Sequence, residues 1–152
     1  MEIKQIFENK NKFMDLLLLG DEQESMVNKY LNRGDLYALY DDDLKTVCVI
    51  TKESEKTYEL KNIATYEKYQ RKGYGSQMIK YIVEKYKNQC DLLLVGTGDI
   101  ERILNYYKKF GFEYSHRIED FFIKNYDHVM IEDGKQLKDM VYLNIDYKKM
   151  KM

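Results

Sequence analysis

The stretch "IATYEKYQRKGYGSQMIKYIVEKY" (residues 63–86) places two glycines, Gly73 and Gly75, where a helical pattern begins. They follow the basic pair Arg71 and Lys72, in a chain with only 8 glycines and no proline. A glycine-containing turn at a helix start leaves backbone N–H groups free, and with the helix dipole these groups form an anion site suited to phosphate. The stretch therefore predicts a phosphate-binding loop, with glycines that merely allow a tight turn as the alternative.

The loop does not match the common nucleotide-binding motifs. No Gly-Lys-Ser/Thr follows the glycines, as a P-loop requires. The third glycine of the dinucleotide fingerprint would fall at Met78. The pattern that remains is Gln70-x-x-Gly73-x-Gly75.

Length and charge limit the classes of protein to consider. A chain of 152 residues is expected to form one domain over residues 1–152. Its 25 Lys and Arg nearly balance its 26 Asp and Glu, which disfavours nucleic-acid binding. No apolar run of about 18 residues is present, so we expect no membrane span. Cys48 and Cys90 lie in apolar segments without a CxxC pattern, which favours free thiols in the cytoplasm.

Before the loop, the pattern predicts a strand at 1–6, a helix at 13–19 and a second helix from Asp21 to Gly34. Glu24, three residues after Asp21, suggests a capping box for the second helix. Three strands follow, "DLYALY", "KTVCVIT" and "TYELKNIAT", with residues 41–43 as a solvated acidic turn between the first two. The residues that the second helix should bury are Met26, Val27, Tyr30 and Leu31.

After the loop, a helix is expected with an apolar stripe. The continuous apolar run "DLLLVG" then predicts a strand buried on both faces in a parallel pairing. Another helix should end at Gly111, the residue type favoured at that position. "FEYSHRIEDFFI" (112–123) and "MVYLNIDY" (140–147) are expected to be strands. The apolar stripe of the helix directly after the loop consists of Met78, Ile79, Ile82, Val83 and Tyr86. The stripe of the helix that ends at Gly111 consists of Ile100, Ile103, Leu104 and Tyr107. One face of the last strand consists of Val141, Leu143, Ile145 and Tyr147.

This order predicts a mixed α/β (α+β) fold. The central sheet should be mainly antiparallel, with a parallel strand pair near residues 57–95, and about four helices should flank it.

A second motif lies one helix after the glycine loop: "YYKKFGF" contains Tyr107-x-Lys109-x-Gly111-Phe112. The two motifs together resemble the GNAT superfamily of N-acetyltransferases, in particular its small bacterial members. In that family Q/R-x-x-G-x-G/A grips the pyrophosphate of acetyl-coenzyme A (acetyl-CoA), and Y-x-K-x-G-F closes a helix beside the thiol. The resemblance runs at high specificity from about residue 59 to 112, and the order of elements extends it over the chain. It implies acetyl-CoA as cosubstrate and no metal.

The resemblance also implies which residues bind the coenzyme. The backbone N–H near Ile63 would meet the thioester oxygen, where a preoriented donor contributes about 3 kcal/mol in other acyl-transfer sites. The backbone at Ala64 and Thr65 would pair with the pantetheine arm like an added strand. The loop residues expected at the pyrophosphate are Gln70, Arg71, Lys72, Gly73, Tyr74, Gly75 and Ser76.

Two side chains are candidates for proton transfer. An alkyl amine has a pKa near 10.4, so a base must remove its proton before it attacks. Glu59 lies on the expected central strand where some family members carry this base, although a salt-bridged strand residue is the alternative. Tyr107 matches the family tyrosine that protonates the coenzyme thiolate, with a core tyrosine as the alternative; Tyr106 is interpreted as packing.

Other features depart from the family or give weaker signals. Glu67 stands where the family often has proline, and Asp99 lies where many members offer an asparagine, so Asp99 is expected only to cap a helix. His116 and His128 have no nearby Cys or His partner in sequence, so no metal site is expected. His116 and Asp120 face either an acceptor pocket or the surface.

The sequence therefore predicts a cytoplasmic, acetyl-CoA-dependent N-acetyltransferase. A primary amine, on a small molecule or a peptide, would attack directly in a ternary complex, because no cysteine occupies a motif position. The alternative is a non-catalytic coenzyme A-binding sensor or interaction module. Segments 12–33 and 115–138 should form the acceptor site, and their acidic and aromatic residues suggest a cationic acceptor. Similar proteins are commonly homodimers.

Overall fold

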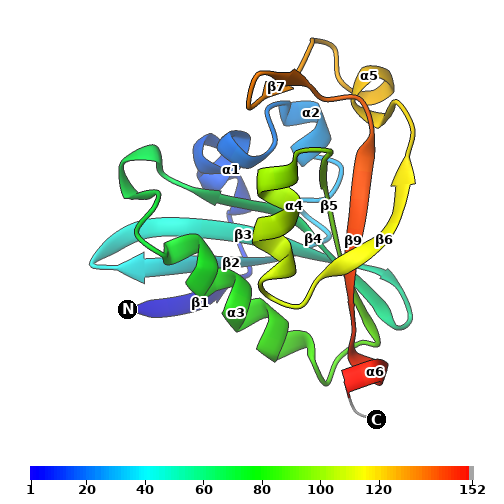
Figure 1. Cartoon of the computed structure of the whole chain (residues 1–152). Coiled ribbons are helices and arrows are strands. Elements are labelled where there is room, and N and C mark those ends of the chain that lie inside the picture. The colour runs from blue at the N-terminus through cyan, green and yellow to red at the C-terminus, as the bar shows by residue number, and fades with distance from the viewer. Residues whose placement is uncertain (151–152) are drawn as a thin grey trace.

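The computed structural model describes residues 1–150, with side chains through Lys149 (Figure 1). Its main sheet has seven strands in the order β1-β2-β3-β4-β5-β9-β6, and neighbouring strands are antiparallel except for the parallel pair β4–β5. The predicted fold class is confirmed. The strands are β1 (Glu2–Ile6), β2 (Asp35–Asp41), β3 (Asp43–Ser54), β4 (Thr57–Thr65), β5 (Leu92–Gly98), β6 (Glu113–Ile118) and β9 (Met140–Asp146), with a separate hairpin of β7 (Ile131–Glu132) and β8 (Lys135–Gln136).

All four predicted helices are present, and two short ones are added. None of the helices in the described residues is long and apolar enough to cross a membrane. The helices are α1 (Met14–Gly20), α2 (Glu24–Val27), α3 (Tyr74–Tyr86), α4 (Glu101–Lys108), α5 (Phe121–Asn125) and α6 (Tyr147–Met150), with 3-10 turns at Lys10–Phe13 and Glu67–Tyr69.

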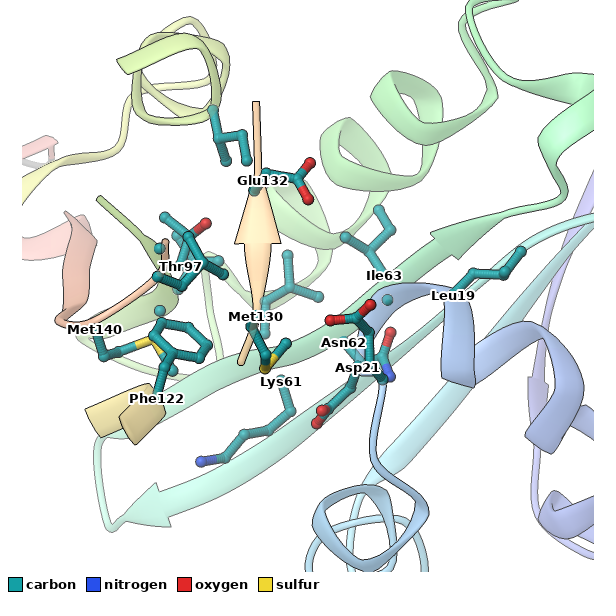
Figure 2. Close-up of a pocket in the computed structure, with 18 of the residues that line it drawn as sticks. Leu19, Asp21, Lys61, Asn62, Ile63, Thr97, Phe122, Met130, Glu132 and Met140 are labelled. Atoms are coloured by element: carbon teal, nitrogen blue, oxygen red, sulfur yellow. The ribbon is translucent and has the colours of Figure 1, made fainter. Parts of the chain in front are cut away.

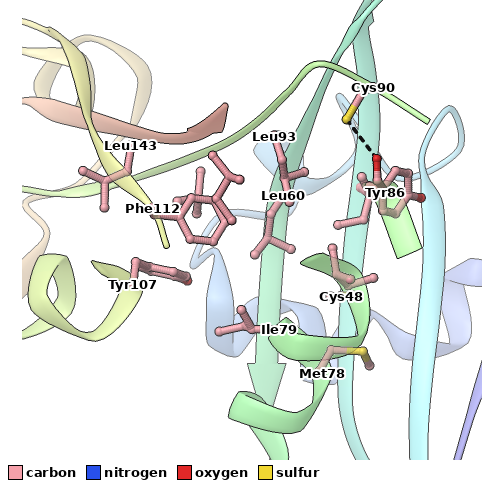
Figure 3. Packing of buried hydrophobic residues seen from close by; sticks show 14 of the residues in the cluster. Cys48, Leu60, Met78, Ile79, Tyr86, Cys90, Leu93, Tyr107, Phe112 and Leu143 are labelled. Atoms are coloured by element: carbon pink, nitrogen blue, oxygen red, sulfur yellow. Dashed lines mark hydrogen bonds between the residues drawn. The ribbon is translucent and has the colours of Figure 1, made fainter. Parts of the chain in front are cut away.

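The sheet has a hydrophobic core on each face, because successive side chains of a strand point to opposite sides. Tyr37 and Leu39 of β2 pack in the core that α3 and α4 cover, whereas Leu36 and Ala38 pack in the core that α1 covers. Figure 3 shows the first core, where the stripe of α3 meets β4, β5 and α4. The predicted residues Met78, Ile79, Ile82 and Tyr86 of α3 are buried there.

The segment after α1 is less helical than predicted. Helix α2 has only 4 residues and begins after Gln23, without a side-chain hydrogen bond at its cap. The predicted capping box at Asp21 is wrong, because the Asp21 carboxylate instead accepts hydrogen bonds from two tyrosine hydroxyls. The predicted burial of Met26, Val27, Tyr30 and Leu31 is confirmed.

Two strand predictions need correction. The strand predicted at 112–123 ends at Ile118, because the chain turns at Asp120, whose φ of 55° is left-handed, and continues as α5. Strand β5 is not buried on both faces: Leu93 and Val95 are buried, but the alternate residues Leu92 and Leu94 are only partly covered. Its second neighbour is the antiparallel β9 rather than another parallel strand.

Strands β4 and β5 pair over only part of their lengths. The parallel register runs from Thr57 opposite Leu92 to Leu60 opposite Val95. Beyond these pairs the two strands diverge. On its other side, β4 has a bulge, since Ile50 of β3 faces Leu60 and Val49 faces Asn62, which leaves Lys61 as the extra residue. A bulge of this kind bends the strand and redirects its side chains.

The stability of the fold should depend on a hydrogen-bond network between the hydroxyls of Tyr86 and Tyr37 and the Asp35 carboxylate. The Tyr86 hydroxyl donates to Asp35 Oδ2 at 2.8 Å and lies 3.0 Å from the Tyr37 hydroxyl. Removing it by Tyr86→Phe leaves the buried Tyr37 hydroxyl without this partner. We expect a loss of about 1–2 kcal/mol in the free energy of unfolding, measured by urea denaturation. Tyr114→Phe, at a side chain that is 56% exposed, is the control; equal stability of the two variants would contradict the role of the network.

Candidate active site

A cavity of about 370 Å³ opens where β4 and β5 diverge (Figure 2). Residues 60–63 of β4 and 95–98 of β5 form two of its walls. Helix α4 contributes Ile103 and Tyr107, and the end of α1 together with the connection after it contributes residues 19–22. The remaining lining comes from Phe122, Tyr126, Met130, Glu132, Leu137 and Met140.

Tyr107 lies in the wall of this cavity and also packs in the core, so the two sequence interpretations of this residue are compatible. Its side chain is 8% exposed, and its ring contacts Phe112 edge-on at 5.8 Å between centroids. Gly111, the residue predicted to end the helix, has a left-handed conformation with φ of 102°, and Phe112 after it is buried in the core. Burial raises the pKa of the Tyr107 phenol above its ordinary value. The hydroxyl therefore stays protonated at neutral pH and can donate a proton.

Of the three consecutive β4 residues expected at the thioester and the pantetheine arm (Ile63, Ala64 and Thr65), Ile63 is the one that lines this cavity. Ala64 packs in the core beneath α1 and is 6% exposed. The backbone contacts expected of these residues do not depend on where their side chains lie.

Glu59, the predicted base, does not line the cavity. Its carboxylate is buried and lies 3.3 Å from the ammonium of Lys61, which does line the cavity. Burial raises the pKa of the Glu59 carboxyl, and the charge of Lys61 partly opposes this effect. This geometry is that of the salt-bridged alternative, and a catalytic role for Glu59 stays a prediction.

A second cavity, of about 590 Å³, lies at the glycine loop. Lys72 is exposed and is not part of its wall. The Gln70 side chain donates from Nε2 to the Thr65 carbonyl at 3.1 Å and so ties the loop to the end of β4. Seven predicted coenzyme residues line this cavity, namely Thr65, Gln70, Arg71, Gly73, Tyr74, Gly75 and Ser76, and they are joined by Tyr69, Arg102, Tyr106 and Asp133.

Different constraints favour glycine at the two positions of the loop. Gly73 precedes α3 with φ of 88°, a conformation that strains other residues. A side chain at Gly75 would meet only ordinary contacts, at 3.6 Å from the Tyr106 hydroxyl and 3.7 Å from Thr65 Oγ1. Packing within the protein therefore does not require glycine at position 75. Close approach of a ligand to the start of α3 does explain it.

The acidic turn between β2 and β3 is more than the solvated turn expected from the sequence. Asp43 forms an ion pair with Lys45 and accepts a hydrogen bond from the Tyr69 hydroxyl at 2.7 Å. Asp41 accepts one from the Tyr74 hydroxyl, also at 2.7 Å. The hydrogen bonds from Lys45 and Tyr69 lower the pKa of the Asp43 carboxyl to about 2. The turn thus holds the two tyrosines that flank the glycine loop.

The β7–β8 hairpin, which the sequence did not indicate, lies across both cavities. Arg102 on α4 binds both carboxylate oxygens of Asp133, at 2.7 and 3.0 Å, and contacts Glu132 at 3.3 Å. Glu132 lines the first cavity and Asp133 lines the second. The hairpin is therefore fixed to the helix that carries Tyr107.

Three polar residues fall outside the two cavities. The helix-cap prediction for Asp99 is wrong, since Ile100 precedes α4 and the Asp99 carboxylate pairs with Arg117 at 3.3 Å. His116 and Asp120 are exposed, and His116 stacks on Tyr142, so the surface alternative is correct for both. Within residues 1–149, no group of three potential metal ligands occurs.

The end of the first cavity nearest α1 has polar residues that sequence reasoning did not bring together. The Asp21 carboxylate accepts hydrogen bonds from Tyr30 at 2.9 Å and from Tyr126 at 2.7 Å. Asn62 of β4 donates to the Tyr30 hydroxyl at 3.1 Å and to the Leu17 carbonyl at 2.9 Å. Tyr126 is 105 residues from Asp21, and no local sequence signal reports such a contact.

Comparisons with known proteins match this geometry. The family model described as an acetyltransferase (GNAT) domain matches residues 32–114. A Bacillus subtilis (strain 168) protein named uncharacterized N-acetyltransferase YvbK is 38% identical over 142 residues, which cover 91% of this chain and 92% of that protein.

Two similar solved structures contain the coenzyme. A GNAT family acetyltransferase from Elizabethkingia anophelis with acetyl-CoA bound has a TM-score of 0.90 and 32% identity, over 95% of this chain and 97% of that one. A Bacillus subtilis acetyltransferase in complex with CoA has a TM-score of 0.87 and 37% identity, with the same coverage of 95% and 97%.

Substitutions in the acidic turn test whether its contacts hold the glycine loop in place for coenzyme binding, and Asp42 in the same turn provides the control. Asp43→Asn removes the charge that pairs with Lys45 and weakens the acceptor for Tyr69. We expect coenzyme A affinity to fall about 3- to 10-fold, measured by titration calorimetry at pH 7.5. Asp42→Asn should leave the affinity unchanged, because Asp42 is exposed and asparagine tolerates its φ of 69°.

The contacts of Asp43 with Lys45 and Tyr69 should stabilise the protein only over a defined pH range. The folded-state pKa of Asp43 is lowered from 3.8 to about 2, so its contribution is complete above about pH 4 and is lost as the pH falls through 2. Titration of Asp43 should therefore not change coenzyme affinity between pH 5 and 8. Equal affinities of the Asp43→Asn and Asp42→Asn variants would show that the turn does not hold the loop.

Proposed function

The chain belongs to the GNAT family of acetyltransferases, with acetyl-CoA as its cosubstrate, and from this premise we propose that it acetylates a primary amine by direct attack in a ternary complex. One observation carries the proposal: the cavity with Ile63 and Tyr107 and the cavity at the glycine loop are lined by the same three parts of the chain. These parts are β4, α4 and the β7–β8 hairpin. A coenzyme can thus lie along β4 with its phosphates at one end and its thioester at the other.

In this proposal the coenzyme is held mainly by backbone groups. The loop from Gln70 to Ser76 holds the pyrophosphate through the unpaired N–H groups at the start of α3, with Arg71 and Lys72 supplying positive charge. The diverging backbone at Ala64 and Thr65 pairs with the pantetheine arm. The N–H near Ile63 donates to the thioester oxygen, which gains negative charge during attack.

Direct attack is supported by the positions of both cysteines. Cys48 and Cys90 are buried in the core, and neither lines the first or the second cavity. Burial also raises the pKa of the Cys48 thiol, so it is a poor nucleophile at neutral pH. An amine that enters the first cavity therefore meets the thioester without an acetylated cysteine between them.

Proton transfer is assigned to two groups. Tyr107, whose raised pKa keeps it protonated, gives its proton to the departing thiolate. Glu59 is kept as the predicted base. A proton must reach it through Lys61 or through solvent, because Lys61 lines the cavity and Glu59, its ion-pair partner, does not. We place this reaction in the cytoplasm and in one catalytic domain, and we allow a small-molecule or a peptide amine as acceptor.

Replacing Tyr107 with Phe tests the acid and separates an enzyme from a coenzyme sensor. We expect turnover, followed as thiol release from acetyl-CoA with an amine mixture, to fall about 100- to 10,000-fold. Coenzyme A affinity should stay within about twofold. The control is Tyr114→Phe, at an exposed tyrosine. Unchanged turnover would remove Tyr107 as the acid, and a wild-type protein that binds coenzyme A but releases no thiol would support the sensor.

The order of events can be tested by initial rates. With both substrates varied, double-reciprocal lines should converge, because both substrates must be bound before the acetyl group moves. Protein incubated with radiolabelled acetyl-CoA alone and then denatured should carry no label. Parallel lines together with label on Cys48 or Cys90 would establish an acetyl-enzyme instead.

A further inference from the structure

The end of the first cavity nearest α1, where Asp21 and Asn62 lie, is called the acceptor end. It carries negative charge that no ion pair within residues 1–149 neutralises. Four charged side chains line this cavity: Asp21, Glu22, Lys61 and Glu132. Lys61 is paired with Glu59, and Glu132 with Arg102, both at 3.3 Å. Within the described residues, neither Asp21 nor Glu22 takes part in an ion pair. The unbalanced charge is therefore that of two carboxylates.

The Asp21 carboxylate is held in a fixed position by neutral donors. Tyr30 donates to Oδ2 and Tyr126 to Oδ1, one to each oxygen. Burial and the charge of Asp21 raise the pKa of both phenols, so both remain donors at neutral pH. Each carboxylate oxygen accepts more than one hydrogen bond, and Asp21 therefore retains acceptor capacity toward the cavity. It also follows the C-terminal end of α1, where the helix dipole favours a cation.

Asn62 supplies a second and independent sign of a missing donor. Its side chain lines the cavity and is 4% exposed, and its Nδ2 is used by Leu17 and Tyr30. These two partners fix the orientation of the amide, which leaves Oδ1 without a hydrogen bond among the described residues. The oxygen lies against Gly20, where a Cβ atom would come within 2.1 Å of it. The unpartnered oxygen therefore lies beside the residue that precedes Asp21.

This end of the cavity lies beside the reacting centre. A Cβ atom on Gly20 would also come within 2.8 Å of the Ile63 carbonyl, so the backbone just before Asp21 touches the β4 residue assigned to the thioester. The segment that carries Asp21 therefore lies next to the part of β4 assigned to the thioester.

The side of the cavity across from Asp21 is formed mainly by apolar side chains, and the Glu132 carboxylate that also lines the cavity is paired with Arg102. Figure 2 shows Phe122 and Met140 across the cavity from Asp21. Phe122 and Met130 are buried, at 7% and 8% exposure, and Leu137 lies in the same wall. A hydrocarbon or aromatic group fits this wall, whereas a second charge would lose its hydration there. A carboxylate on the acceptor would also be repelled by Asp21 and Glu22.

We propose that Asp21 binds the reacting nitrogen of the acceptor, and that the acceptor is a primary amine with an apolar body and no carboxylate group. This inference rests on the proposed function, since it names the acceptor of the same reaction. Asn62 acts as a positioning residue for Tyr30, and through it for Asp21.

The chemistry balances without another reactant. The base step assigned above to Glu59 removes the first proton of the ammonium before the attack. The neutral amine then attacks the acetyl carbon, which forms the C–N bond and places a positive charge on nitrogen beside Asp21. The C–S bond then breaks, and the thiolate takes the proton of Tyr107. After the attack, the nitrogen loses a second proton to Asp21 and then to solvent, while solvent returns one to Tyr107. The products are the amide and coenzyme A.

Three acceptors with acetyl-CoA test the proposal: 2-phenylethylamine, phenylalanine and spermidine. They are an apolar amine, its carboxylate-bearing counterpart and a polyamine. We expect kcat/KM, from thiol release, to be at least 10-fold higher for 2-phenylethylamine than for either of the others. Asp21→Asn should raise KM for 2-phenylethylamine about 10- to 100-fold, because it removes a charged acceptor, and should leave the coenzyme A Kd unchanged. That unchanged Kd also shows that the variant is folded.

Two further variants complete the experiment. Glu24→Gln, three residues along the same segment and outside the cavity wall, should leave both constants unchanged. Tyr126→Phe keeps the charge of Asp21 but removes one of its anchors, so we expect a smaller rise in KM, about 3- to 10-fold. It serves as the reporter if Asp21→Asn does not fold.

The outcomes separate the two levels of the proposal. Faster turnover of phenylalanine or spermidine would overturn the acceptor class and leave the amine acetyltransferase intact. An unchanged KM in both Asp21→Asn and Tyr126→Phe would remove Asp21 from the acceptor site. Absence of thiol release with all three amines would count against the proposed function as well as this inference.

Discussion

The site depends on one constraint, the incomplete pairing of β4 and β5, the one parallel strand pair within residues 1–150. Strands β4 and β5 share a register of only four residue pairs, after which the bulge at Lys61 bends β4 away. Each strand stays in the sheet because its other neighbour holds it, β3 for β4 and β9 for β5. The gap is therefore a stable feature of the sheet. It gives a ligand access both to backbone groups of β4 and to the α4 side chain of Tyr107.

Polar contacts between distant segments then fix the parts that surround this gap. The acidic turn holds the tyrosines that flank the glycine loop. Arg102 fixes the β7–β8 hairpin to α4, and Tyr30 with Tyr126 fixes Asp21 at the other end. The contact between Asp41 and Tyr74 joins the end of β2 to the start of α3, and the others each involve a turn or a segment between the longer elements. Loops held in this way can position reactive groups without being buried in the core.

The extent to which the sequence predicted this arrangement follows from the range of each signal. Helix α3 and strand β9 were identified because apolar periodicity is local, and the glycine loop because φ and helix-start chemistry are local. Asp21 was misassigned as a helix cap, and the helix at Phe121 as strand, because tertiary contacts with Tyr126 and Asp139 outweighed local preference. The partner of Glu59, Lys61, lies two residues along the same strand, so the alternation of side chains already permitted the ion pair. The sequence could not show that Lys61, and not Glu59, lines the cavity. The acceptor end joins residues from α1, β4 and α5, and no sequence pattern spans such separations.

The most direct test of the account is a crystal structure of the protein with acetyl-CoA bound. We predict that the thioester oxygen lies at about 2.9 Å from the backbone nitrogen near Ile63, with the sulfur beside the Tyr107 hydroxyl and the pyrophosphate at the start of α3. The acetyl carbon should then face Asp21 across open space large enough for an amine. A thioester located outside the gap between β4 and β5, or a sulfur out of reach of Tyr107, would contradict the account.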